Sequence, residues 1–315
     1  MAYGTDLPLV STGVGFRSNF GPIVLDPGAR VAAYVRSTGA VSDEDPVIAN
    51  NLVATLAEGL ARCRAGKNDV VFVLPGHTEN VSGTTMTSGL KAGTRVIGCG
   101  IGTNRPNFRW TTTTAQWVLD DADCSFSNLI LRIEGAVVVK GIVCTAANCA
   151  ILNCDIDTGT VASTNLATIG VEIGAGATNF KFQGNYVHSV ADSGSTSVIK
   201  VAGVCDGATI VNNKIMAATA TAATIGVIDI TAAATNLDIG DNLLQNKLAS
   251  SQVGLSVTGA VACTGVVYDN FVATEAGTPV SDSFLVNAAS LLRFFDNKGS
   301  DTKNTSGLLA PAVVT

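Results

Sequence analysis

A short asparagine-centred pattern that recurs about every 28 residues restricts what this chain can fold into more than any other feature of its sequence. Each copy has an apolar alternating stretch, usually a small or acidic residue, then Asn, then a second apolar stretch. The asparagines are Asn128, Asn153, Asn185, Asn213, Asn242, Asn270 and Asn297. Their spacings of 25, 32, 28, 29, 28 and 27 residues are typical of a solenoid, in which successive repeats stack on one another.

Alternation within the repeats predicts short strands. Apolar residues flank single charged ones in Val171-Glu172-Ile173, Phe180-Lys181-Phe182 and Ile228-Asp229-Ile230. A period of two directs the apolar side chains inward and the charged one outward. Each repeat has room for about three such strands, and coils stacked at the strand spacing of roughly 4.8 Å form a parallel β-helix.

The repeated asparagines are expected at bends between strands, because Asn tolerates the left-handed region of backbone conformation. At equal spacing their side chains would stack into a ladder of amides along the rod. The alternative is that each is an independent turn residue. The same spacing places Cys124 and Cys149, each four residues before an asparagine of the series, one above the other inside the rod.

A second series of residues keeps nearly the same spacing on another strand of the coil. Lys140, Glu172, Lys200, Asp229 and Ser256 are separated by 32, 28, 29 and 27 residues, against 32, 28, 29 and 28 for the asparagines of the same coils. We therefore expect Lys140, Glu172, Lys200 and Asp229 to form a column of alternating charge on one outer sheet. Exposed pairs of this kind contribute about 0.2–1 kcal/mol each, so they would fix register more than stability.

The chain divides into four segments around this repeat. Asp45-Pro46 is a helix-start signal, and apolar residues recur every four positions from Ile48 to Leu60, so we predict an amphipathic capping helix over residues 46–66. It would cover the first open edge of a β-helix spanning 67–300. Residues 1–45 show no coil period and are expected to be an extended arm, which either lies along its own β-helix or docks on another subunit. The tail, 301–315, ends in an apolar run that also requires a covering surface.

Charge and composition exclude several classes of protein. A net charge of −6, with the basic residues scattered, offers no face for binding nucleic acid. We expect no secretory signal and no membrane span, since the first residues lack a basic and then apolar run and polar residues and glycines interrupt the 21 uncharged residues from Leu248 to Tyr268. The eight cysteines form no CxxC pair and there are two histidines, so we expect buried thiols, no metal site and no cofactor. Disulfides within or between subunits stay an open alternative.

Catalysis on such a rod would require carboxylates clustered on the outer face of one sheet. Asp155 and Asp157 share a face if they lie in a strand, whereas the adjacent Asp120 and Asp121 point to opposite faces. For Asp155 and Asp157 we favour a solvated bend, with a catalytic pair as the alternative.

The remaining candidates are assigned structural roles. His77 has no obvious acidic partner, and His188 follows a strand as an exposed edge residue would. Trp110 and Trp117 are expected in a core or an interface rather than as a platform for stacking sugars. We therefore predict no catalytic residue.

The segment from Ala33 to Val81 resembles a known class of protein. It contains AAYVRSTG, then the Asp45-Pro46 helix with NLVATLAEGLARCRAG, then NDVVFVLPGHTENV, and is similar to the opening of right-handed parallel β-helix proteins of the pectate-lyase-like class found among tailed-bacteriophage virion proteins. The resemblance implies an all-β, right-handed parallel β-helix. Such proteins include capsid decoration or cement proteins, commonly trimeric, and tail spikes that bind or cleave surface glycans. The chain differs from enzymatic spikes because it lacks an acidic cluster on one sheet and has few aromatic residues.

On this basis we expect a non-enzymatic virion structural protein, specifically a capsid decoration or cement protein that bridges coat subunits through its arm and rod surface. Its expected partners are the major capsid protein or other virion subunits, with a homotrimer as the assembly and neither nucleic acid nor membrane as a ligand. Its expected location is the capsid surface, after synthesis in the host cytoplasm. The alternative is a tail spike or fibre that binds or degrades host surface glycans, as a polysaccharide lyase or glycosidase.

Overall fold

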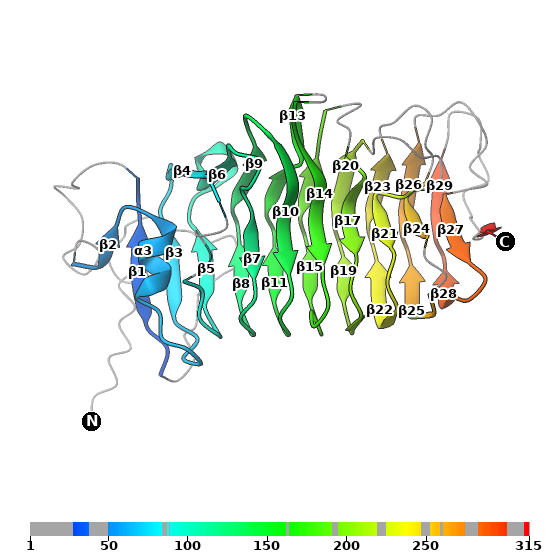
Figure 1. Cartoon of the computed structure of the whole chain (residues 1–315), viewed down its shortest axis with the longest axis horizontal. Coiled ribbons are helices and arrows are strands. Elements are labelled where there is room, and N and C mark those ends of the chain that lie inside the picture. The colour runs from blue at the N-terminus through cyan, green and yellow to red at the C-terminus, as the bar shows by residue number, and fades with distance from the viewer. Residues whose placement is uncertain are drawn as a thin grey trace.

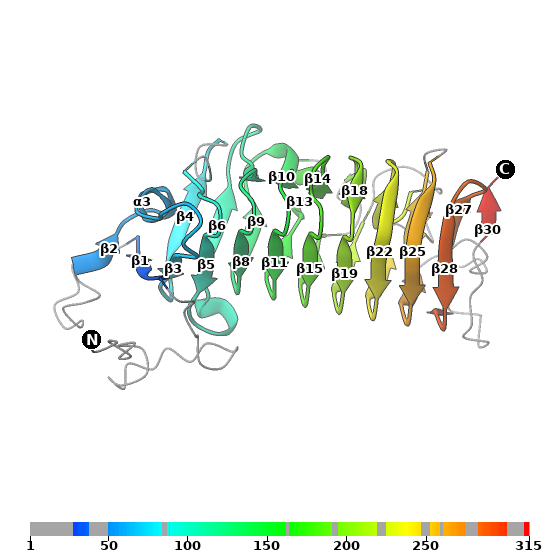
Figure 2. The ribbon, with the colours of Figure 1, turned by 90° about the horizontal axis from the view of Figure 1, so that it is seen from below.

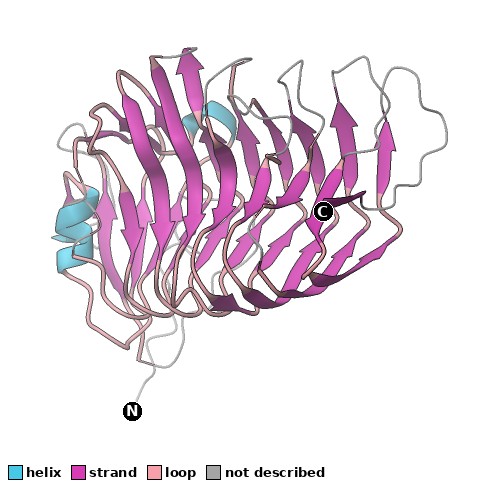
Figure 3. Ribbon diagram, turned by 45° about the vertical axis from the view of Figure 1, so that its right-hand side comes forward, coloured by secondary structure: helices cyan, strands magenta, loops and turns pink. Residues whose placement is uncertain are grey.

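The computed structural model describes residues 28–37, 50–83, 87, 89–161, 164–190, 195–218, 225–246, 253–258, 261–274, 283–300 and 312–314. Over these ranges the chain forms a parallel β-helix whose coils run side by side along one axis (Figure 1). Each regular coil contributes one strand to each of three sheets, which wind around a common interior (Figure 3). The predicted β-solenoid with coils of roughly 28 residues is confirmed.

The three sheets differ in length but share the order of the coils. Sheet A contains β2 (Leu52–Val53), β1 (Val31–Val35), β3 (Val70–Val73), β5 (Arg95–Gly98), β8 (Ser125–Ser127), β11 (Ala150–Leu152), β15 (Lys181–Gln183), β19 (Thr209–Val211), β22 (Ala234–Gly240), β25 (Cys263–Tyr268) and β28 (Leu291–Phe295), with β18 (Cys205–Asp206) beside β22. Sheet B contains β4 (Thr78–Val81), β6 (Asn107–Trp110), β9 (Ile130–Ile133), β12 (Asp155–Asp157), β16 (Tyr186–His188), β20 (Lys214–Ala217), β23 (Leu243–Asn246), β26 (Phe271–Thr274) and β29 (Lys298–Ser300). Sheet C contains β7 (Trp117–Leu119), β10 (Val137–Cys144), β14 (Asn165–Ile173), β17 (Ser197–Val201), β21 (Ile228–Ile230), β24 (Leu255–Val257), β27 (Phe284–Asn287) and β30 (Ala312–Val314), with β13 (Gly159–Val161) antiparallel to β14.

The core is a set of apolar columns that run along the rod. Phe126, Ile151, Phe182, Ile210 and Ile239 are successive partners in sheet A, and all are fully buried. Because each apolar side chain contacts the equivalent one in the next coil, burial accumulates coil by coil along the stack.

Two smaller predictions about the core are also confirmed. Cys124 and Cys149 are fully buried in successive coils, and all eight cysteines are buried free thiols. Trp110 and Trp117 belong to the core, with 1% and 0% of their surface exposed and ring centroids 5.7 Å apart.

Five of the seven predicted asparagines form an uninterrupted amide ladder at the bend from sheet A to sheet B. The side-chain nitrogens of Asn185, Asn213, Asn242 and Asn270 each donate to the side-chain oxygen of the asparagine in the next coil, at 3.1, 3.0, 2.8 and 2.9 Å, and the ladder ends at Asn297. Each of these nitrogens also donates to a backbone carbonyl of the preceding coil, and each side-chain oxygen also accepts from a backbone N–H. All five side chains are buried, so the ladder satisfies polar groups that cannot reach water.

The prediction that Asn128 and Asn153 belong to this ladder is wrong. Both have left-handed backbone, with φ of 56° and 52°, and they occupy the turn position just before the ladder position. In later coils that turn position is taken by Gly184, Asn212 and three aspartates, Asp241, Asp269 and Asp296, all with positive φ. Cys154 occupies the ladder position of its coil, and its contact with the ladder is a hydrogen bond from its backbone N–H to the side-chain oxygen of Asn185. The left-handed turn and the amide ladder are therefore two separate columns.

The predicted charge column is correct in part. Glu172, Lys200, Asp229 and Ser256 are in-register partners on sheet C, but the residue opposite Glu172 in the preceding coil is Val143, while Lys140 pairs with Ile169. The matching 32-residue intervals therefore do not reflect a shared register. Lys140 still reaches Glu172 along the sheet, with its Nζ 2.9 Å from Oε1.

The column is also less exposed than predicted. Glu172 is 9% exposed and Asp229 is 2% exposed. Ser256 and Thr258 donate to the same oxygen of Asp229, at 2.7 and 3.0 Å. At the Asp229 end of the column, hydroxyl groups therefore supply the hydrogen bonds to the carboxylate.

In the described residues the predicted capping helix over 46–66 is interrupted, because Asn50 and Asn51 are helical but a strand follows them. The helix α3 spans Leu56–Ala61, and Leu52–Val53 instead form β2, which pairs with β1. Thr55 and Glu58 form a capping box, which starts α3 at Leu56. The extended backbone of β2 separates α3 from the residues before it. The predicted start at Asp45-Pro46 lies outside the described residues.

Helix α3 lies over the first strands at the N-terminal end of the stack (Figures 1 and 2). A Cβ added at Gly59 would approach Val71 and Val35 at 3.0 and 3.1 Å, so this face of the helix contacts the inward side of β1 and β3. The predicted covering of the first coil by a helix is therefore observed, with a shorter helix than expected.

The predicted arm and tail both contribute strands. β1 lies within the segment 1–45 and joins sheet A between β2 and β3, so this part of the arm belongs to the stack. β30 lies within the tail and pairs with β27 at the end of sheet C. Residues 1–27, and with them the docking site of the arm, lie outside the described part of the chain. In the described ranges no helix has the length and apolarity needed to cross a membrane.

The ladder can be tested by substituting two neighbouring asparagines. Asn213→Ala removes the amide that binds Phe182 O, Asn185 and Asn242, and leaves buried polar groups unpaired, so we expect a loss of about 2–4 kcal/mol in the free energy of unfolding. Asn212→Gly changes the adjacent exposed turn residue, whose φ of 56° glycine adopts readily, and should alter stability by less than about 0.5 kcal/mol. Urea unfolding of both variants measures the difference, and equal effects would contradict the ladder.

Candidate functional site

The described residues bring charged side chains together on the outer face of sheet B. In β12, Ile156 points into the core, so Asp155 and Asp157 on either side of it point outward. In β16, the next strand of the sheet, His188 lies directly opposite Asp157 and Tyr186 lies opposite Asp155. Regular stacking of coils therefore assembles this cluster from residues about 30 positions apart.

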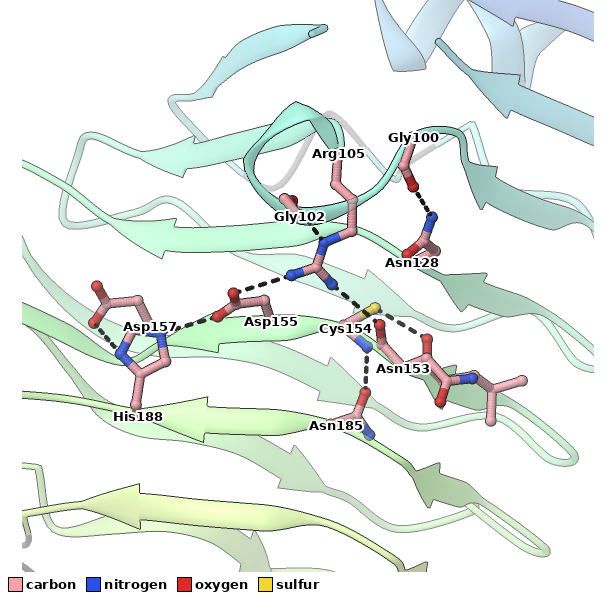
Figure 4. A network of polar contacts seen from close by, with 11 residues as sticks. Gly100, Gly102, Arg105, Asn128, Asn153, Cys154, Asp155, Asp157, Asn185 and His188 are labelled. Carbon is pink, nitrogen blue, oxygen red and sulfur yellow. Dashed lines mark hydrogen bonds and ion pairs between the residues drawn. The ribbon is translucent and has the colours of Figure 1, made fainter. Parts of the chain in front are cut away.

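Asp155 is the centre of the cluster (Figure 4). One of its oxygens, Oδ1, lies 2.9 Å from Nε2 of His188, and the other, Oδ2, accepts a hydrogen bond from Arg105 at 3.0 Å. Arg105 follows the short 3-10 helix η1 (Gly102–Asn104) and is held by Gly102 O and Asn153 O. The loop between η1 and β6 therefore places the guanidinium group of Arg105 over the outer face of sheet B, where it reaches β12, two strands beyond β6.

Asp157 is bound less completely than Asp155. Its Oδ1 lies 3.9 Å from Nδ1 of His188 and accepts a hydrogen bond from the backbone N–H of Gly159 at 3.2 Å. The imidazole of His188 therefore faces both carboxyl groups. The three side chains keep 23%, 13% and 24% of their surface exposed for Asp155, Asp157 and His188, so water and ligands have access to them.

An aromatic side chain extends the cluster along the rod. The ring of Tyr186 stacks on His188 with centroids 4.7 Å apart, and Lys214 from β20 lies 5.3 Å from the centre of the Tyr186 ring. Tyr186 remains 38% exposed. The face therefore presents a partly exposed ring beside a set of hydrogen-bonding and charged groups.

The surroundings shift the two carboxyl pKa values in opposite directions. Burial raises the pKa of Asp155, but the hydrogen bond from His188 and the charges of His188, Arg105 and Arg132 together bring it below its usual value. Burial also raises the pKa of Asp157, and the opposing effects of His188, Gly159 and Arg132 leave it above its usual value. One carboxylate that stays ionised beside one that protonates more readily is an arrangement suited to acid–base chemistry.

The structure corrects three expectations about these residues. Asp155 and Asp157 do share a face, but they lie in a strand and not in a solvated bend. His188 is not an isolated edge residue, since it contacts Asp155 and Tyr186. His77 has an acidic partner after all, because its Nε2 lies 3.0 Å from Glu79, two residues further along β4.

The pair of His77 and Glu79 has a structural role. The same oxygen of Glu79 accepts the backbone N–H of Leu56 at 2.9 Å, and the His77 side chain is fully buried against Phe108. Glu79 therefore ties the first turn of α3 to sheet B.

Two cationic members of the cluster were not found from the sequence. Arg105 reaches Asp155 from 50 residues away through a loop, and no periodic pattern predicts this contact. Arg132 is the in-register partner of Asp157 in β9, so a correct alignment of the coils would have identified it. The predicted ladder and charge-column residues lie outside this face of sheet B, apart from Asn153, whose backbone carbonyl accepts a hydrogen bond from Arg105.

Among the described residues, no group of three or more His, Cys, Asp and Glu side chains is arranged to hold a metal ion. Comparison with known proteins finds no protein-family profile that matches the chain and no curated protein that matches it significantly.

The opposed pKa shifts give a test of the cluster. Removing the guanidinium by Arg105→Ala should raise the pKa of Asp155 and leave that of Asp157 nearly unchanged, because Arg105 contributes to the first carboxyl and not to the second. In the native protein, the stabilisation from Asp155 should be present above its unfolded pKa and be lost as the pH falls through its lower folded pKa. Carboxyl-carbon NMR titration measures both groups, with Arg109→Ala as the control. Equal shifts of the two carboxyls would contradict the arrangement.

Proposed function

We propose that this chain is a non-enzymatic structural protein of a tailed-phage virion, and specifically a decoration or cement protein on the capsid surface. The opening segment from Ala33 to Val81, which resembles that of phage β-helix proteins, suggests the virion. The proposed partners are the major capsid protein and two further copies of the chain. In this role the rod bridges neighbouring subunits and carries no catalytic step.

The observation that carries this proposal is an apolar edge at the C-terminal end of sheet A. Among the described strands β28 is the last of this sheet, and it pairs with β25 on one side. Along its outer face Leu291 is 67% exposed and Phe295 is 51% exposed. Large apolar side chains on a terminal strand favour contact with another protein surface.

The rest of the rod suits a bridging role because it is rigid. The apolar columns of the core and the five-asparagine ladder couple each coil to the next, so the distance between two points on the rod is fixed by the number of coils between them. A spacer of constant length is what a protein that ties coat subunits together requires.

The apolar edge provides the test of the structural role. The double variant Leu291→Ser, Phe295→Ser removes exposed apolar surface without touching the ladder, so the chain should fold normally and bind its particle or its own copies at least tenfold more weakly. Occupancy on purified particles and the oligomeric state by light scattering are the measurements.

Ile101→Ser is the matched control, because Ile101 is 62% exposed but lies near the other end of the rod. Normal occupancy and assembly in the double variant would contradict docking through β28. Equal losses in the double variant and the control would show that exposed apolar surface in general, and not this edge, drives association.

A second candidate function is binding or cleavage of host surface glycans by a tail spike. The cluster of Asp155, His188 and Asp157 beside the exposed ring of Tyr186 favours it, since carboxyl pairs and aromatic rings are the groups that glycan-active sites use. Turnover of a bacterial polysaccharide that disappears in Asp155→Ala or Asp157→Ala would establish this function in place of the structural one.

A further inference from the structure

We propose that the outer face of sheet B holds an oxyanion-binding site centred on Arg132, for a carboxylate, sulfate or phosphate group carried by a ligand. This site goes beyond the structural role and does not depend on it. It lies on β9, between the strands β6 and β12 that flank it in the sheet.

Pairing the charges on this face leaves Arg132 without an acidic partner. Arg105 is paired with Asp155 at 3.0 Å, and Arg109 with Glu134 at 3.5 Å. Arg132 is the strand partner of both Arg109 and Asp157, but no carboxylate oxygen of the described residues lies within 4.0 Å of its guanidinium. Among the described residues of β6, β9 and β12, Arg132 is therefore the arginine without an ion pair, and it can bind an anion.

The nitrogen closest to the sheet shows the same deficit. Nε of Arg132 is buried and has no hydrogen-bond partner. The same holds for Nε of its neighbour Arg109. Because the buried Nε is out of reach of a ligand, the terminal nitrogens Nη1 and Nη2 of Arg132, which are not buried without a partner, are the groups that a ligand oxygen can contact. The planar guanidinium presents two parallel N–H groups, which match the two oxygens of a carboxylate, sulfate or phosphate.

The neighbouring groups on the face are compatible with an anion. Asp155 is already engaged by Arg105 at 3.0 Å and by Nε2 of His188 at 2.9 Å. Asp157, the strand partner of Arg132, has no carboxylate oxygen within 4.0 Å of the guanidinium and accepts a hydrogen bond from the backbone N–H of Gly159.

The exposed ring of Tyr186 gives the site a second element of selectivity. Tyr186 lies in the next strand beyond Asp155 and stacks on His188, so it is within the same patch of the face. A ligand that carries its anionic group on a ring can contact Arg132 and the Tyr186 ring together. A small inorganic anion would use Arg132 alone.

The test is a titration of the full chain followed by NMR of the arginine Nε–H groups. The probes are inorganic phosphate, sodium glucuronate, and glucose as a neutral control, all at constant ionic strength. We expect the Arg132 Nε–H resonance to shift and saturate with phosphate, glucuronate or both, and to stay unchanged with glucose. Saturation by both assigns recognition to the anion, and saturation by glucuronate alone adds a contribution from the sugar ring; either supports the site.

Two variants with the same loss of charge separate a site from general electrostatics. Arg132→Gln should weaken anion binding at least tenfold, whereas Arg293→Gln removes an exposed arginine on the outer face of sheet A and should leave binding unchanged. Equal weakening in both variants, or no saturation by either anion below roughly 10 mM, would overturn the proposal. The wild-type resonance decides the question on its own if Arg132→Gln does not fold.

Discussion

The structure depends on in-register hydrogen bonding between coils, reinforced at one bend by buried asparagine side chains. An amide that donates to the next asparagine and to a backbone carbonyl, and accepts from a backbone N–H, can be satisfied only if the next coil lies directly above it. Slipping the register by one residue would bury these groups without partners and turn the apolar columns outward. The ladder therefore selects one alignment of the coils, while burial of the apolar columns supplies most of the stability.

The period of the sequence predicted this fold because each coil requires the same kinds of residue at the same positions. Inward apolar positions and the asparagines from Asn185 to Asn297 recur at nearly constant intervals, so both were found from spacing alone. Asn128 and Asn153 were assigned wrongly because two adjacent positions of the coil both favour Asn for different reasons. The first requires a left-handed backbone, and the second requires a buried side-chain amide. Lys140 was misplaced because its 32-residue interval to Glu172 equals the interval from Asn153 to Asn185 without reflecting the register, in which Lys140 pairs with Ile169.

The candidate site was only partly predictable because it combines regular and irregular parts. That Asp155 and Asp157 share a face follows from the period of a strand, and their proximity to His188 follows from the coil register. The position of Arg105 depends on the path of a loop, which carries no periodic signal. Whether a carboxyl group is half-buried, and so has a shifted pKa, depends on the neighbours that cover it and not on its own sequence position.

The most direct test of the stacked register measures distances along the outer face of sheet A. Ser125, Lys181 and Arg293 lie in one column, in which Lys181 and Arg293 are four strand spacings apart and Ser125 and Arg293 are six. With spin labels on each pair, electron–electron resonance should give backbone separations of roughly 19 Å and 29 Å, because each coil adds about 4.8 Å. A distance from Ser125 that is no longer than the one from Lys181 would contradict the stacked coils and every site built on them.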